Sequence, residues 1–171
     1  MVTVEESGII FGHFSPDELF EIEKSALLHS LKGDVKCAEF LWYQHLPLCL
    51  WVVEAKTSCP TSTEAPALRD KLVNTMTLCV ATLLGQHAGY AHELPPELSL
   101  NDLTHWDTNF LIVLAKPQPE QWLVMLQNEM NKLMLPFLKT WGFKKSSVKV
   151  VTVNKATTLG LPILSNAHDP Q

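Results

Sequence analysis

LCLWVVEAKTS, the sequence from Leu48 to Ser58, joins an unbroken apolar run to a short charged end. An apolar and β-branched run of this length is typical of a strand that is buried on both faces of a sheet. The charged end holds Glu54 and Lys56, and residues two apart in a strand project from the same face. Because an unpaired buried charge is costly, we expect both groups to have partners.

A second strand is expected over Cys37 to Tyr43, followed by a short turn-like segment. If the two strands form a hairpin centred between Leu46 and Pro47, Glu39 faces Glu54. Facing residues have Cβ atoms roughly 5 Å apart, so two like charges in these positions repel each other. A divalent cation held between the carboxylates is the simplest reason for such a pair, because hard cations take oxygen ligands.

An acid followed by acid-x-Lys at the end of an apolar strand resembles the PD-(D/E)XK nuclease superfamily, which has the restriction-endonuclease-like fold. The pattern here is Glu39…Glu54-Ala55-Lys56, with Glu rather than Asp as the first acid and no Pro before it. The resemblance implies that Glu39 and Glu54 bind Mg²⁺ or Mn²⁺ and that Lys56 orients or helps to deprotonate the attacking water. The implied reaction is hydrolysis of a phosphodiester in DNA, with RNA as the second choice.

A third acid, Glu23, belongs to a helix that we expect to begin at Ser15-Pro16 and to run to about Leu31. At about 100° per residue, Glu23 falls near the middle of the apolar arc of this helix. The first helix of the nuclease family often supplies a further acid, so the resemblance makes Glu23 a candidate ligand and catalytic residue. The alternative is that Glu23 pairs with a core lysine or lies at a fraying edge.

The remaining elements follow the hairpin in a simple order. The pattern predicts a helix over residues 64–84, a strand over 109–115, a helix over 120–141 and a strand over 147–153. The order indicates an α/β fold with a mixed central sheet flanked by helices. It also resembles the core of the restriction-endonuclease-like fold. We expect one domain over residues 1–171, with a core of roughly 15–153.

The net charge of the chain is −5, and Arg69 is the only arginine. This balance disfavours a DNA-binding protein that acts alone, because Lys and Arg contacts to phosphates dominate nucleic-acid affinity. Lysines do cluster late in the chain, and Lys144, Lys145 and Lys149 are the candidate nucleic-acid contacts. A solvated surface without function is the alternative for this cluster.

Cysteine usage and the chain start bear on the cellular location. Cys37, Cys49, Cys59 and Cys79 lack the spacing of a zinc site or a disulfide framework, which favours free thiols in a reducing compartment. The first residues show no signal peptide, and no apolar run is long enough for a membrane span. We therefore expect a cytoplasmic protein without a membrane partner.

Other interpretations of the same residues remain open. Glu39, Glu54 and Lys56 can form a simple cross-strand ion-pair cluster. The chain can be a non-catalytic accessory subunit of the same fold, which binds a protein partner that supplies the DNA contacts. It can also be an assembly module that buries the regions of Trp106 and Trp141 in a homo-oligomer.

Overall fold

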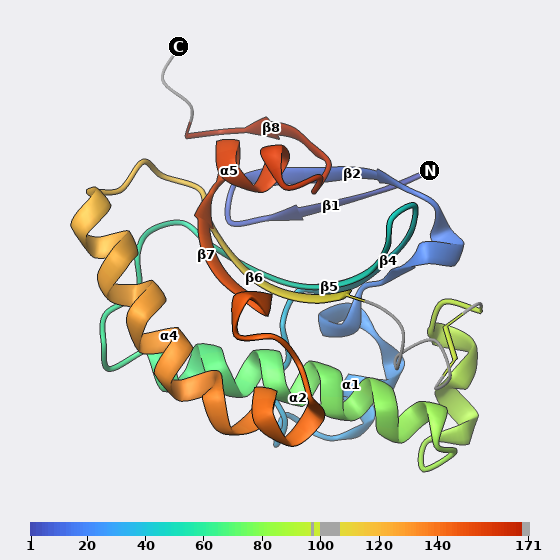
Figure 1. Ribbon diagram of the computed structural model, residues 1–171. Coiled ribbons are helices and arrows are strands. Elements are labelled where there is room, and N and C mark those ends of the chain that lie inside the picture. The colour runs from blue at the N-terminus through green and yellow to red at the C-terminus, as the bar shows by residue number, and fades with distance from the viewer. Residues whose placement is uncertain (97, 100–106, 169–171) are drawn as a thin grey trace.

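The chain folds into three layers built around a five-stranded sheet (Figure 1). The computed structural model describes residues 1–96, 98–99 and 107–168. Its strands are β1 (Val2–Glu6), β2 (Ile9–Phe14), β3 (Leu19–Phe20), β4 (Phe40–His45), β5 (Leu48–Lys56), β6 (Asp107–Leu114), β7 (Val148–Thr152) and β8 (Ile163–Asn166). Its helices are α1 (Ala26–Ser30), α2 (Ala65–Leu83), α4 (Glu120–Trp141) and α5 (Val153–Thr158), with 3-10 helices η1 (Pro16–Glu18), η2 (Ile22–Lys24), η3 (Ala88–Glu93) and η4 (Lys145–Ser147).

The central sheet is mixed, as the sequence predicted, and its strand order is β3-β4-β5-β6-β7. Strands β3, β4 and β5 pair antiparallel, whereas β5, β6 and β7 pair parallel. The short turn after β4 allows the antiparallel pair, and the long segments that contain α2 and α4 provide the crossovers that parallel strands require. Strand β5 lies in the middle of the sheet and is buried from Cys49 to Ala55.

The hairpin of β4 and β5 has the predicted register. Phe40 faces Val53, and the pairing continues without a slip to His45 and Leu48. Glu39 lies one residue before this ladder, and its N–H donates to the carbonyl of Val53 at 3.0 Å. The backbone of Glu39 is therefore held beside the charged end of β5.

Two hydrophobic clusters cover the two faces of the central sheet. Helices α1, α2 and α4 lie over one face, where Leu72 and Ile112 belong to the buried cluster (Figure 1). The other face is covered by α5 and by a three-stranded sheet of order β1-β2-β8, where Phe11 and Val53 belong to the cluster. The sheet is thus flanked by helices, but a second sheet shares one of its faces, so both ends of the chain contribute to the core.

The single helix expected from Ser15 to Leu31 was a wrong prediction. The segment instead contains η1, β3, η2 and the five-residue helix α1. Leu19 and Phe20 pair with β4, and their side chains enter opposite clusters, which is the alternation of a strand. Ser25 then starts α1, because its side chain accepts a hydrogen bond from the Leu28 N–H at 3.1 Å.

The strand expected over Cys37 to Tyr43 is β4, which begins three residues later, at Phe40, and ends at His45. The two long helices and the strands β6 and β7 lie within two residues of their predicted positions. Pro136 does not interrupt α4, which continues to Trp141 and ends at Gly142 in the left-handed conformation. The segment after Pro162 contains β8, which pairs with β2.

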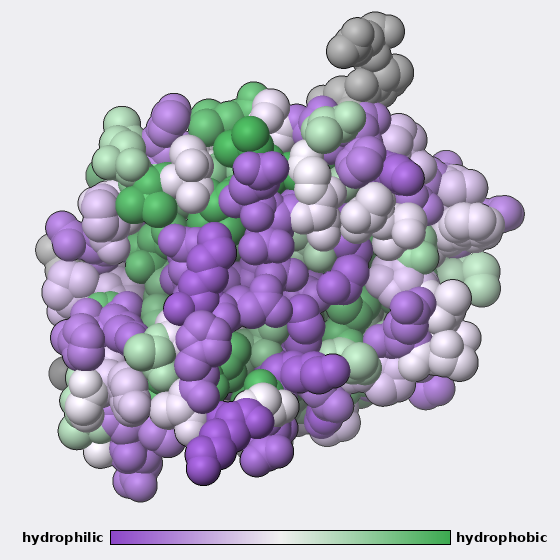
Figure 2. Space-filling view, turned by 180° about the vertical axis from the view of Figure 1, so that it is seen from behind, coloured by the Kyte–Doolittle hydropathy of each residue, from purple (hydrophilic) through white to green (hydrophobic). Residues whose placement is uncertain are grey.

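The surface mixes polar and apolar side chains. Seen from the side opposite to Figure 1, hydrophilic residues spread over the middle of the molecule and hydrophobic residues form separate patches (Figure 2). Among the described residues, the large hydrophobic side chains that are exposed are Met1, Leu46, Leu48, Leu84, Trp122, Val124, Met125, Trp141 and Leu164. None of the helices in the described part of the chain combines the length and apolarity of a membrane span.

The hairpin offers a direct test of the core. Leu50 is 0% exposed and Leu46, in the adjoining turn, is 88% exposed. We expect Leu50→Ala to lower the free energy of unfolding by about 2–5 kcal/mol, because it removes apolar contacts and leaves a cavity. We expect Leu46→Ala to change it by less than about 0.5 kcal/mol. Urea denaturation followed by tryptophan fluorescence measures both values, and equal effects would contradict the assignment of Leu50 to the core.

Candidate functional site

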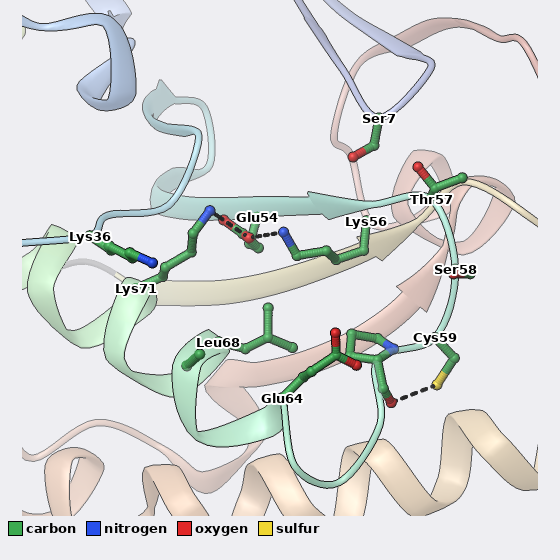
Figure 3. A pocket seen from close by; sticks show the side chains of 12 residues that line it. Ser7, Lys36, Glu54, Lys56, Thr57, Ser58, Cys59, Glu64, Leu68 and Lys71 are labelled. Atoms are coloured by element: carbon green, nitrogen blue, oxygen red, sulfur yellow. Dashed lines mark hydrogen bonds and ion pairs between the residues drawn. The ribbon is translucent and has the colours of Figure 1, made fainter. Parts of the chain in front are cut away.

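The centre of the candidate site is the carboxylate of Glu54, which is 0% exposed at the charged end of β5. Lys56 lies on the same face, as its spacing predicts, and its Nζ is 2.7 Å from Glu54 Oε1. Lys71 approaches from α2, with its Nζ 2.9 Å from Oε1 and 3.2 Å from Oε2. The two ammonium groups thus reach this carboxylate from different elements (Figure 3). Together they provide the partners that a buried negative charge requires.

Lys71 was not predicted from the sequence, although it contacts more acidic groups than Lys56 does. Its Nζ also lies 3.7 Å from Glu23 and 3.8 Å from Glu39. The side chain is only 17% exposed. Lys71 lies at the edge of the apolar arc of α2, next to the buried Leu72, and a lysine at such an edge is the one signal that could have suggested this role.

Glu39 is buried beside this group and holds its proton unusually strongly. Burial raises the pKa of Glu39 from 4.5 to about 9, and a hydrogen bond with Glu23 and the nearby charge of Glu54 act in the same direction. Its Oε2 atom is buried, and within the described residues it has no hydrogen-bond partner.

Glu23 reaches the site from η2, whereas we expected it on the apolar face of one long helix. Its hydrogen bond with Glu39 is the main reason that the pKa of Glu23 is lowered, and the charge of Lys71 contributes further. Its side chain is partly exposed, and its pairing with Lys71 matches the alternative interpretation given for this residue. Glu23 thus contacts a lysine and also lies in a group of acids, so both interpretations of this residue remain open.

Glu6 completes the acidic cluster and was missed because no role was assigned to the N-terminal segment. Strand β1 ends at Glu6, and the turn that follows has Ser7 and Gly8 at positive φ. Carboxylate oxygens of Glu6, Glu23 and Glu39 lie within 4.8 Å of one another, which is close enough for one cation to contact all three. We call Glu6, Glu23, Glu39 and Glu54 the acidic cluster.

A pocket of about 520 Å³ opens next to Glu54 (Figure 3). Lys36, Lys56 and Lys71 line it, together with the hydroxyl groups of Ser7 and Thr57. Glu54 and Glu64 line the same pocket, and Lys56 and Lys71 already pair with Glu54. An anion with several oxygens, such as a phosphate, would therefore depend on Lys36, on the hydroxyl groups and on the remaining charge of the paired lysines. The acidic cluster and the lysines therefore offer one place for a cation and another for an anion, side by side.

Two of the late lysines, Lys144 and Lys145, precede β7, and Lys149 lies on β7 itself. Lys144 forms an ion pair of 2.5 Å with Asp107, the first residue of β6. Lys149 donates to Asn109, and burial lowers its pKa. Lys145 is exposed in η4. The acidic cluster adjoins the opposite end of β5 and β6 from Asp107, roughly 17 Å away at the rise of a strand. Lys149 is level with Leu111 and Val53, but its ammonium group donates to Asn109, so none of the three lysines is placed at the site.

Comparisons with models of protein families, with curated proteins and with solved structures give no match. Function is therefore inferred from the chemistry of the site.

The proton on Glu39 predicts a pH dependence of stability. Between pH 4.5 and about 9, the unfolded chain releases this proton while the folded protein keeps it, so the free energy of unfolding falls as the pH rises. We expect Glu39→Gln, which cannot titrate, to flatten this decline. Urea denaturation at several pH values between 5 and 9 measures how steeply the free energy of unfolding changes with pH.

Glu5→Gln is the matched control, because Glu5 is exposed on β1. Its slope should equal that of the wild type. A slope that is unchanged in Glu39→Gln would show that Glu39 is ionised in the folded protein.

Proposed function

We propose that the chain is a metal-dependent phosphodiesterase of the PD-(D/E)XK type, which acts on DNA and less readily on RNA. The observation that carries this proposal is the arrangement at Glu54. The fully buried carboxylate of Glu54 lies near the end of the central strand, and the Lys56 ammonium is 2.7 Å from it. Glu39 lies just before β4, and its backbone N–H bonds to the carbonyl of Val53. These are the residue types and the order that the resemblance requires.

The order of the elements adds support. A short first helix, a hairpin, a long helix, a strand, a second long helix and a strand follow one another around one mixed sheet. The first helix is much shorter than expected, with only the five residues of α1. The restriction-endonuclease-like assignment therefore depends on the sheet and on the position of the acids at its charged end.

The donor set fits Mg²⁺ or Mn²⁺, because both ions prefer carboxylate oxygens. Glu39 forms the triad with Glu6 and Glu23, and Glu54 is not part of it. Lys71 connects the two, since its Nζ lies 3.8 Å from Glu39 and 2.9 Å from Glu54. The buried Oε2 of Glu39 has no partner within the described residues, as expected of a ligand atom. When bound, the ion would supply a water of lowered pKa and would polarise a phosphoryl oxygen.

The protein residues have separable tasks in this proposal. Glu39 must lose its proton before its oxygens can bind a cation, so cation binding becomes stronger as the pH rises towards 9. Lys56 is half-exposed at the pocket and can donate to a non-bridging phosphate oxygen or hold the attacking water. Lys71 lies among Glu23, Glu39 and Glu54, so its ammonium group must shift if a cation is to lie between Glu39 and Glu54.

The position of Lys71 also favours a second candidate, a non-catalytic protein of the same fold. Lys71 and Lys56 already neutralise Glu54, so the cluster can serve stability alone. A partner or a second copy would then provide the function. Of the two aromatic regions proposed for assembly, Trp106 lies outside the described residues, and Trp141 is partly exposed while it stacks on Phe143.

Metal titration separates these two candidates. We expect the wild-type protein to bind Mn²⁺ in a calorimetric titration and Glu39→Gln to bind it at least about tenfold more weakly, since one ligand is lost. Glu54→Ala should also lose binding, and Glu5→Gln should bind like the wild type. If neither the wild type nor any variant binds Mn²⁺, the phosphodiesterase proposal fails and the non-catalytic candidate is preferred.

Lys56 provides a test of the reaction itself. We expect Lys56→Met to lower the rate of Mn²⁺-dependent cleavage of DNA roughly 100- to 1,000-fold, because a positive group next to the developing charge is removed. Its Mn²⁺ affinity should stay close to the wild-type value. Lys116→Met is the control, since Lys116 is exposed just after β6. Wild-type cleavage rates in a folded Lys56→Met protein would exclude the role proposed for Lys56.

A further inference from the structure

A second pocket, of about 330 Å³, adjoins the lysine-lined pocket. It lies between the loop that follows β5 and the first turns of α4, and we call it the Trp122 groove. Its lining residues are Cys59, Pro60, Thr61, Ser62, Trp122, Met125, Leu126 and Glu129. The volume lies within the range of about 300–1,000 Å³ that is typical of small-ligand sites.

Trp122 provides an exposed aromatic ring in this groove. The indole is 50% exposed, and the neighbouring Met125 is 69% exposed, so a flat apolar surface faces solvent. The backbone beneath it is held firmly: the Trp122 N–H donates to the Pro119 carbonyl at 2.9 Å, and the Cys59 thiol lies 3.8 Å from the Trp122 carbonyl. An exposed aromatic ring on a fixed backbone is suited to stacking on another flat ring.

The groove and the pocket at Glu54 lie on either side of the segment that follows β5. Cys59 and Pro60 line both spaces. On one side of them lie Lys36, Lys56 and Lys71, which suit a phosphate, and on the other side lies an apolar groove with an exposed indole. A site that can bind an anion next to an exposed aromatic ring matches the chemistry of a nucleotide, whose phosphate and base lie next to each other.

Glu129 makes the Trp122 groove chemically different from the lysine-lined pocket. Its carboxylate lines the groove and disfavours a phosphate there. A carboxylate can, however, accept a hydrogen bond from an exocyclic amino group of a base. The groove therefore suits a base better than it suits a second phosphate.

We propose that the Trp122 groove binds one unstacked base of a single-stranded nucleic acid whose adjacent phosphate lies in the lysine-lined pocket. This inference rests on the proposed function and names its substrate class: single strands and frayed ends, not continuous duplex. Bases inside a duplex are already stacked and cannot present a face to Trp122 without unpairing. A chain with net charge −5 and one arginine also lacks the broad phosphate contacts that hold a duplex.

Binding of a labelled single-stranded oligonucleotide, with and without its bases, tests the groove. Fluorescence anisotropy in Ca²⁺ is compared for the wild type, Trp122→Ala, Trp122→Phe and Val124→Ala. We expect Trp122→Ala to weaken binding roughly 5- to 100-fold, the loss typical of one base–aromatic stack. Trp122→Phe should keep most of the affinity. Val124→Ala should match the wild type, because Val124 is 51% exposed on the same helix but does not line the groove.

An abasic oligonucleotide keeps the phosphates and removes the rings. We expect the wild type and Trp122→Ala to bind it equally. If Trp122→Ala binds the normal oligonucleotide like the wild type, the base site is excluded, and the groove is left as a surface for an apolar side chain of a protein partner. If Trp122→Ala loses affinity for both oligonucleotides alike, its effect is not on a base and the proposal also fails.

The two proposals fail in different ways. A wild-type protein that binds the normal oligonucleotide through Trp122 but does not cleave it in Mn²⁺ would overturn the phosphodiesterase and retain the base site. Cleavage that is equally efficient in wild type and Trp122→Ala, with equal affinities, would retain the phosphodiesterase and overturn the base site. A wild type that binds neither oligonucleotide would overturn the base site as well.

Discussion

Burial of the Glu54 carboxylate is the constraint on which the site depends. A carboxylate with no exposed surface is stable only if positive groups lie next to it, and Lys56 and Lys71 lie within 3 Å of its Oε1. One lysine comes from the same strand and the other from α2, so the charge pairing links the helix to the sheet. The apolar contacts between α2 and the sheet then hold Lys71 among the acids.

The acidic cluster contains more negative groups than this pairing needs. Lys56 and Lys71 can balance Glu54 and one further acid, yet Glu6, Glu23 and Glu39 also converge there. The protein relieves part of the excess by keeping a proton on Glu39, whose pKa is raised to about 9. A network selected for stability alone would gain from replacing these acids by apolar groups. Of these acids only Glu39 and Glu54 are buried, while Glu6 is partly buried and Glu23 is exposed, so solvent also relieves part of the repulsion.

The sequence was informative where contacts are local. The apolar run of β5, the spacing of Glu54 and Lys56 and the position of the turn were sufficient for the hairpin register, and helical periodicity located α2 and α4. The segment around β3 was misjudged, because Leu19 and Phe20 fit an apolar helical arc as well as a short strand. Glu6 could not be predicted: it joins the site only because the small sheet packs on the central one, and such long-range contacts leave no local pattern.

The distribution of positive charge limits how the chain can hold a nucleic acid. Lys144 is paired with Asp107 at the end of β6 that is remote from the acidic cluster, and Lys149 donates to Asn109. Lys36, Lys56 and Lys71 are the cations that line the pocket at the cluster, and two of them already contact Glu54. Few phosphates can be neutralised by so small a set, so affinity must come from other contacts or from a partner. Stacking on an exposed aromatic ring is one contact that a chain with a single arginine can still provide, and Trp122 is such a ring beside the pocket.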